Sequence, residues 1–131
     1  MEVGERNFFA KEERLYLKKE INRLFESGLS FVSHPLRILY LSESNASESG
    51  VSILVSVPKK RFKQSVKRNR IKRLMRETYR SNSNTLKSVA LQNGRKLQIA
   101  LLYASNDLPT CGAMKTGMIK ALKILENKIL E

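Results

Sequence analysis

The chain has 131 residues, a length typical of one domain, and 41% of them are apolar, which suffices for a modest core. Its 25 Lys and Arg residues against 12 Asp and Glu residues give a formal net charge of +13, whereas small domains usually carry roughly 2–8 in magnitude. The single cysteine and single histidine exclude an intrachain disulfide, a cysteine-based zinc cluster and a pair of imidazole ligands. The excess positive charge predicts a polyanionic partner, either a nucleic acid or an anionic membrane surface.

Targeting signals are not evident. No apolar run approaches the roughly 18–20 residues that span a bilayer. Residues 1–6 lack the basic start and the apolar run of a signal peptide. We therefore expect a soluble, cytoplasmic protein that forms one domain over residues 1–131.

The first predicted helix covers Arg14 to Gly28. Its apolar residues recur at three- and four-residue spacing, as Leu17, Ile21, Leu24 and Phe25. Gly28 is placed to end the helix in a left-handed cap. Pro35 then biases His34 towards an extended conformation, so a loop is expected there.

Two strands are predicted next, over Leu36–Leu41 and Val51–Val57, with the polar loop Ser42–Gly50 between them. The first contains β-branched and aromatic residues. In the second, alternate residues share one face, namely Val51, Ile53, Val55 and Val57. The polar loop suggests that the two strands form an antiparallel pair, and Pro58 closes the second strand.

The second half begins with a helix over Ser65–Arg80. Residues 81–94 are polar and irregular, and a short turn of helix is predicted around 86–91. A third strand covers Leu97–Tyr103, and an amphipathic helix covers Ala113–Leu130. The predicted order is α-β-β-α-β-α, and the fold class is α+β, with one small sheet packed by helices.

The excess charge is concentrated between residues 58 and 80. Eleven basic residues against one acid, Glu77, give this segment +10 of the chain's +13. The eleven are Lys59, Lys60, Arg61, Lys63, Lys67, Arg68, Arg70, Lys72, Arg73, Arg76 and Arg80. Such a concentration is typical of a polyanion site.

The basic helix has two different faces at about 100° per residue. The apolar face consists of Ile71, Leu74, Met75, Thr78 and Tyr79. The opposite face consists of Asn69, Lys72, Arg73, Arg76 and Arg80, with Arg70 at its edge. The helix can therefore pack on a sheet while it presents arginine forks and lysine charges to phosphates.

A merely solvated helix, a helix at a membrane surface and a DNA-binding helix each fit these charges less well. A solvated helix usually mixes both signs. A helix at a membrane surface would expose bulky apolar residues, which the core needs here. Recognition of DNA by a helix-turn-helix would need a partner helix at close spacing. We therefore expect neither a membrane nor DNA as partner.

One stretch of the sequence carries a specific pattern. It contains Val57-Pro58-Lys59-Lys60, then Arg68-Asn69-Arg70, and then Lys72-Arg73 and Arg76-Glu77. This pattern resembles the signature of the bacterial ribonuclease P protein family. The helix end Leu24-Phe25-Glu26-Ser27-Gly28 is similar to the family's aromatic-x-x-Gly helix end, and the resemblance extends over about residues 9–130.

The chain departs from the pattern at Arg61-Phe62-Lys63-Gln64, where many family members have a shorter turn with glycine. Phe62 is therefore either an exposed aromatic residue beside the RNA site or a plug of the loop. The sequence leaves the role of this insertion open.

The resemblance implies a function and a fold. The family's enzyme removes the 5′ leader of precursor tRNA, and the catalyst is the RNA subunit with bound Mg²⁺. The protein subunit binds and positions the RNA, so the implied partners are ribonuclease P RNA and precursor tRNA. The implied fold is a ribosomal-protein-like α/β sandwich with a left-handed β-α-β crossover, although right-handed crossovers are the general rule.

The resemblance also implies site residues. The RNA-binding residues would be Lys59, Lys60, Lys67, Arg68, Asn69, Arg70, Lys72, Arg73 and Arg76. A cleft between the first helix and the sheet would hold the single-stranded leader by charge and by stacking on aromatic rings. The candidates for this leader cleft are Ile21, Phe25 and Tyr40, although Ile21 stands where the family commonly has an aromatic residue. For Phe25 and Tyr40, a place in the core is the alternative.

Two further function classes compete with this one. A structural RNA-binding protein of the ribosome fits the composition equally well, and only the Arg68-Asn69-Arg70 signature argues against it. A self-sufficient nuclease would need clustered carboxylates for metal ions or a histidine with an acid-base partner. The acids of the first helix are expected to face solvent for the most part, namely Glu12, Glu13, Glu20 and Glu26. We therefore expect no catalytic residue, metal ligand or bound cofactor, and we expect Cys111 to be inert and His34 to lie in a loop.

Overall fold

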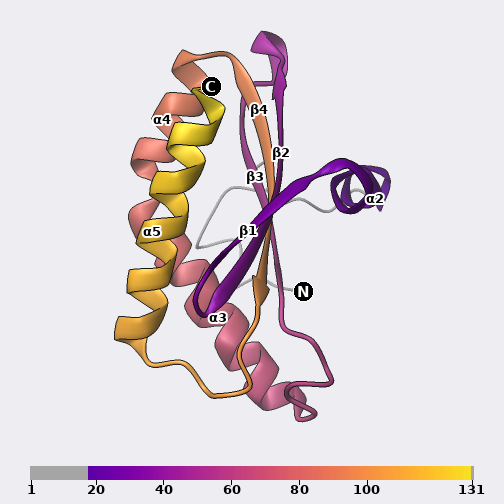
Figure 1. The fold of residues 1–131 in the computed structure, drawn as a ribbon, viewed down its shortest axis with the longest axis vertical. Helices are drawn as coiled ribbons and strands as arrows, with labels where there is room; N and C mark the ends of the chain where they lie inside the picture. Colours follow the sequence, from indigo (N-terminus) through magenta and orange to yellow (C-terminus); the bar gives the residue numbers. More distant parts are fainter. Residues whose placement is uncertain (1–17, 131) are drawn as a thin grey trace.

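A computed structural model describes residues 18–130 of the chain (Figure 1). Its helices are α2 (Lys18–Ser27), α3 (Ser65–Asn82), α4 (Asn84–Gln92) and α5 (Cys111–Ile129), with a short 3-10 helix, η2 (Ala46–Glu48). Its strands are β1 (Leu29–Ser33), β2 (Leu36–Ser44), β3 (Gly50–Ser56) and β4 (Arg95–Tyr103). Residues 14–17 of the first predicted helix lie outside the described residues.

The four strands form one sheet in the order β1-β2-β4-β3. Strand β2 is antiparallel to both β1 and β4, whereas β3 is parallel to β4. The predicted antiparallel pairing of β2 with β3 is therefore wrong, because β4 lies between them. Strand β4 takes the central place because Leu97 to Leu101 are buried on both faces, as an inner strand requires.

The parallel strands β3 and β4 are joined through α3 and α4, so the connection is a crossover. The left hand of this crossover stays a prediction from the resemblance. Helix α4 is longer than the single turn expected between residues 86 and 91, and β1 was not expected at all. The observed order of the described elements is thus α-β-β-β-α-α-β-α.

Strand β1 pairs with β2 as a hairpin, with Leu29 opposite Tyr40 and Ser33 opposite Leu36. The turn consists of His34 and Pro35, which are joined by a cis peptide bond. His34 thus lies in a loop, as expected, and it is exposed. Because β1 is short and lies at the sheet edge, its apolar residues are largely exposed and do not show the alternation of a half-buried strand.

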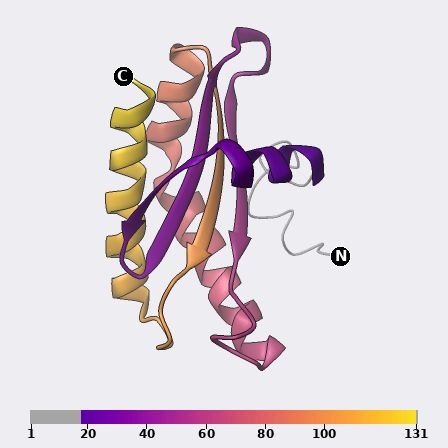
Figure 2. The same ribbon diagram turned by 45° about the vertical axis from the view of Figure 1, so that its right-hand side comes forward.

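The sheet has a different cover on each face. Among the described helices, α3, α4 and α5 lie against one face, and α2 lies against the other (Figures 1 and 2). The predicted alternation of β3 is confirmed, because Val51 and Ile53 are buried on the side of α3 to α5, followed by Val57 just past the strand. The main core therefore lies between the sheet and three helices, and α2 adds a second, smaller cluster.

The smaller cluster consists of residues from α2 and from the facing side of the sheet. Leu24 and Ala100 are buried in it, and partly buried apolar residues pack around them, namely Ile21, Leu39, Leu41, Leu54 and Leu102. Helix α2 is thus anchored by a leucine that is fully removed from water.

Gly28 follows α2, but it does not adopt the predicted left-handed cap, because positive φ values are found only at Gly50 and Gly94 among the described residues. Glycine is required at position 28 because the chain approaches itself closely there. A Cβ atom would lie 2.5 Å from the Leu24 carbonyl oxygen and 3.0 Å from the Tyr40 carbonyl oxygen. The left-handed cap is found instead at Gly94, which follows α4 with φ 59°.

Within residues 18–130, no helix is both long and apolar enough to cross a bilayer. The extension of one domain over the whole of residues 1–131 stays a prediction.

Candidate nucleic-acid interface

Helix α3 has the two faces that its sequence predicts. Ile71, Met75 and Tyr79 are buried against the sheet and α5, whereas Arg70 and Arg73 are exposed. Thr78 also lies on the inner face, where its hydroxyl donates to the Leu74 carbonyl oxygen at 2.7 Å. Because the inner face is fixed by packing, the outer face must point away from the sheet.

The predicted RNA-binding residues lie on α3 and on the loop that precedes it. Exposed among them are Lys59, Lys60, Lys67, Asn69, Arg70 and Arg73, and half-buried are Arg68, Lys72 and Arg76. We call the exposed cations, together with Lys63 and Lys72, the cationic surface. Figures 1 and 2 show this loop and the start of α3 at the end of the sheet where β3 and β4 both end.

Arg68 does not direct its whole guanidinium outward. Its Nη1 atom donates to the carbonyl oxygens of Phe62 at 2.9 Å and of Lys63 at 2.8 Å. Both acceptors belong to the loop before α3. This contact was not foreseen, because no periodicity or motif in a sequence indicates a side chain that bonds to the backbone of a loop.

Phe62 is the plug of the loop and not an exposed aromatic residue. Only 8% of it is exposed, and its ring packs against Tyr103 with 5.9 Å between the ring centroids. Of the two interpretations of Phe62, the exposed one is therefore wrong. A second contact fixes the same loop from outside, since Arg61 Nη1 donates to Asn106 Oδ1 at 2.9 Å.

Tyr103 supports this loop through its buried ring, and its hydroxyl donates to the Asp107 carbonyl oxygen. Burial raises the pKa of the Tyr103 hydroxyl above 10.0; a hydrogen bond with Ser105 opposes the rise, and the Asp107 carboxylate adds to it. The folded state therefore holds this proton more tightly than the unfolded chain does.

A dependence of stability on alkaline pH follows. The contribution of the Tyr103 proton is fully present below about pH 10 and is lost as the pH rises through the folded pKa. We expect Tyr103→Phe to show a smaller loss of unfolding free energy between about pH 9 and about pH 11 than the unchanged protein, in denaturant titrations. Equal losses in the two proteins would contradict this role.

The predicted leader-cleft residues do not all lie together. Phe25, half exposed, and Ile21, partly buried in the smaller cluster, both belong to α2. Tyr40 lies on the opposite face of the sheet, in the main core, where it is 6% exposed and meets the Phe31 ring edge-on at 5.9 Å. The expected place of Tyr40 beside Phe25 is therefore wrong, because the register of β2 directs Leu39 and Leu41 towards α2 instead.

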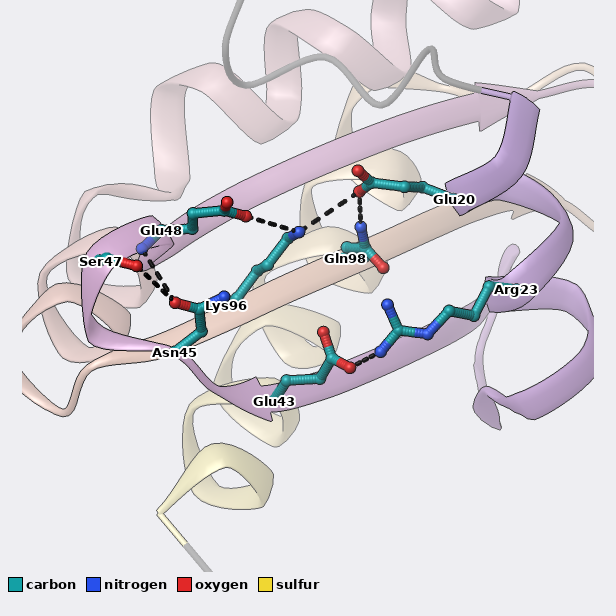
Figure 3. Close-up of polar contacts among 8 residues, drawn as sticks. All are labelled: Glu20, Arg23, Glu43, Asn45, Ser47, Glu48, Lys96 and Gln98. Atoms are coloured by element: carbon teal, nitrogen blue, oxygen red, sulfur yellow. Dashed lines mark hydrogen bonds and ion pairs between the residues drawn. The ribbon is translucent and has the colours of Figure 1, made fainter.

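A network of polar side chains links α2 to β4 and to η2 (Figure 3). Gln98 Nε2 donates to Glu20, and Lys96 Nζ lies 3.6 Å from Glu20 and 3.0 Å from Glu48. An ion pair between Arg23 and Glu43 makes a further link from α2 to β2. Glu20, which was expected to face solvent, is thus half-buried and paired with the sheet.

At its far end the network continues into η2. Asn45 caps this helix, because its Oδ1 atom accepts from the Glu48 backbone N–H at 3.2 Å and from the Ser47 hydroxyl at 3.0 Å. The cap holds Glu48 where Lys96 can reach it. No three His, Cys, Asp or Glu residues gather in a metal-binding group anywhere from residue 18 to residue 130.

The comparisons with known proteins agree with one another. Residues 9–122 match the model of a family described as Ribonuclease P. The ribonuclease P protein component of Porphyromonas gingivalis is 44% identical over 113 residues, which cover 86% of this chain and 82% of that protein. That of Chlorobium phaeobacteroides is 36% identical over 105 residues, with 74% and 72% covered. This chain belongs to the ribonuclease P protein family.

Solved structures of ribonuclease P proteins share the fold. A Staphylococcus aureus RNase P protein mutant with defective mRNA degradation activity gives a TM-score of 0.68 at 23% identity, and the match covers 95% of this chain and 97% of that one. The RNase P protein of Thermotoga maritima gives 0.64 at 21% identity, with 86% and 96% covered. The predicted α+β class, with one sheet packed by helices, is therefore confirmed.

Membership of this family establishes the general function of the chain. The chain is a protein component of ribonuclease P, which acts in tRNA processing, and its implied partner is ribonuclease P RNA. The family signature falls on α3 and on the loop before it, which are also the parts that carry the cationic surface.

Proposed function

We propose that the chain binds the catalytic RNA of ribonuclease P through its cationic surface and so assists the magnesium-dependent removal of the 5′ leader of precursor tRNA. The observation that carries the proposal is the geometry of α3. Ile71, Met75 and Tyr79 anchor the helix in the core, while Arg70 and Arg73 point to solvent on the other side.

The physical basis is electrostatic. A cation that contacts an RNA phosphate releases condensed counterions, which favours binding and makes it depend on salt. Arginine adds a planar fork that bonds two phosphate oxygens at once. In this proposal the RNA subunit and its Mg²⁺ perform the hydrolysis, and the protein lowers the concentration of Mg²⁺ that the folded RNA needs.

The second part of the proposal concerns the leader. Phe25 is 50% exposed on α2, although a fully buried leucine precedes it in the same helix. A half-exposed aromatic ring on a rigid helix can stack with an unpaired base. We therefore place the single-stranded leader against α2 at Phe25, with Ile21 beside it and without Tyr40.

Replacement of Phe25 by alanine tests the leader site. We expect the variant to bind precursor tRNA, in complex with ribonuclease P RNA, roughly 5- to 150-fold more weakly, since one stacked base is worth about 1–3 kcal/mol. Binding of mature tRNA, which has no leader, should change little. The measurement is the Kd of both RNAs with the reconstituted enzyme.

Leu91→Ala is the matched control, because Leu91 is an apolar side chain of similar exposure on α4, in the layer on the other face of the sheet. It should affect neither RNA. If Phe25→Ala weakened the binding of precursor tRNA and of mature tRNA equally, the proposed leader site on α2 would be contradicted.

Reconstitution tests the proposed function as a whole. The protein is mixed with the ribonuclease P RNA of the same organism at low Mg²⁺, and release of the 5′ leader from precursor tRNA is followed. We expect cleavage that neither component performs alone under these conditions. Cleavage by the RNA at an unchanged rate with and without the protein would contradict the proposal.

A further inference from the structure

The loop between β3 and α3, residues 57–64, carries four of the eleven cations of the basic segment, namely Lys59, Lys60, Arg61 and Lys63. It is neither strand nor helix, so its conformation depends on side-chain contacts. Its own backbone contributes one turn, in which the Pro58 carbonyl oxygen accepts from the Arg61 N–H at 3.2 Å and from the Phe62 N–H at 3.4 Å.

Within residues 18–130, three side chains attach this loop to the rest of the fold. Phe62 packs into the core against Tyr103, and Arg61 bonds to Asn106 in the loop after β4. The third attachment is Arg68, in the first turn of α3, whose Nη1 atom bonds to the carbonyl oxygens of both Phe62 and Lys63. Arg68 thus closes the loop onto the helix that follows it.

Nη1 of Arg68 cannot donate hydrogen bonds to the loop and to a phosphate at the same time. Nη1 of Arg68 has two hydrogens, and the two carbonyl oxygens at 2.9 and 2.8 Å accept both. Arg70 and Arg73 differ, because they are exposed on the outer side of α3. Arg61 and Arg68 therefore hold the loop, whereas Arg70 and Arg73 face outward.

We infer that Arg68 is a positioning residue, which fixes Lys59, Lys60 and Lys63 in the arrangement that meets RNA, rather than a phosphate ligand of the same kind as Arg70. The inference rests on the proposed binding of ribonuclease P RNA by the cationic surface. An ordered loop loses less conformational freedom on binding than a mobile one, so its lysines bind more tightly.

The first test measures the order of the loop in the free protein. Arg68→Met keeps most of the aliphatic stem and removes the donors, and Arg70→Met removes the same charge from the same helix without touching the loop. Hydrogen exchange of the amides of residues 59–64 should become faster in Arg68→Met and stay unchanged in Arg70→Met. Unchanged exchange in Arg68→Met would overturn the inference.

The second test is a double-mutant cycle in the binding of ribonuclease P RNA. It compares Arg68→Met, the pair Lys59→Ala and Lys60→Ala, and all three together. If Arg68 acts through the loop lysines, the effects of the changes should not multiply. The loss of affinity for RNA in the triple variant should be at least roughly threefold smaller than the product of the losses in Arg68→Met and in the lysine pair. Losses that multiply would show an independent phosphate contact and overturn the inference.

Two further outcomes are separable. If the unchanged protein failed to bind ribonuclease P RNA, the proposed function would fall, while the exchange experiment would still decide whether Arg68 orders the loop. If Arg68→Met failed to fold, Asn106→Ala would replace it, because it loosens the loop from the other side without removing a cation. Asn106→Ala should then speed exchange in residues 59–64 and weaken RNA binding with an unchanged salt dependence. Faster exchange with unchanged RNA binding would overturn the inference, because the order of the loop would then not matter to RNA.

Discussion

Replacement of both Arg70 and Arg73 by alanine is expected to weaken binding of ribonuclease P RNA by roughly 10- to 100-fold at about 0.1 M salt. Both side chains are exposed on α3, whose opposite face is buried, so their loss should leave the fold intact. Each lost phosphate contact lowers the slope of log K against log salt by about 0.7–0.9, and the pair should lower it by roughly 1.5. The measurement is a binding titration at several salt concentrations.

A matched control removes the same charge elsewhere. Lys120 and Lys123 are exposed on the outer side of α5, and their replacement by alanine lowers the net charge by the same amount. The control should reduce affinity only slightly, through the weaker overall attraction. If the α5 pair lowered affinity and slope as much as the α3 pair, binding would depend on net charge alone and the cationic surface would have no special role.

The largest expected effect on stability comes from Gly117→Ala. Gly117 lies in the middle of α5, where the β1–β2 turn passes directly over the helix. A Cβ atom there would be closer to the His34 carbonyl oxygen than real Cβ atoms come, and it would lie 3.0 Å from Pro35 Cδ. The buried Ser33 hydroxyl also donates to the Gly117 carbonyl oxygen at 2.8 Å, so the turn cannot retreat without breaking this bond.

We expect Gly117→Ala to lower the unfolding free energy by roughly 2–3 kcal/mol, the upper range for an overpacked site, and the Tm by on the order of 10 °C. Gly112→Ala is the control on the same helix, because a Cβ atom there would meet nothing within 4 Å. That change should leave the Tm unchanged or slightly raised, since alanine is the better helix former. Equal Tm values for the two variants would contradict the close approach of turn and helix.

The sequence predicted those parts of the fold that depend on local periodicity. The two faces of α3 follow from the spacing of Ile71, Met75 and Tyr79, and the buried face of β3 follows from the alternation of Val51 and Ile53. In each case one face of a regular element is apolar, and burial of that face determines its orientation.

The sequence could not predict which strands are neighbours. A polar loop joins β2 to β3, yet β4 inserts between them, since its residues from Leu97 to Leu101 are buried on both sides. The order of strands depends on the total burial of each strand in the finished sheet. The error at Tyr40 has a related cause, because a strand of mixed apolar residues such as Leu39, Tyr40 and Leu41 does not show which face meets which helix.

The candidate site, like the fold, has features that the sequence predicts and features that it does not. The exposure of Arg70 and Arg73 was predictable from helical spacing. The turn of Arg68 towards the carbonyl oxygens of Phe62 and Lys63 was not, and neither was the contact of Glu20 with Gln98, because both join side chains to partners whose positions only the folded chain fixes. Sequence reasoning therefore located the cationic surface without the loop geometry that shapes it.

A lysine footprint tests most directly whether the cationic surface docks onto RNA. The protein is acetylated with and without ribonuclease P RNA, and the modified lysines are quantified by mass spectrometry. Binding should protect the lysines of the cationic surface, namely Lys59, Lys60, Lys63, Lys67 and Lys72, while Lys115, Lys120 and Lys123 on α5 stay reactive. Protection confined to α5, or equal on both sides of the molecule, would contradict the proposed interface.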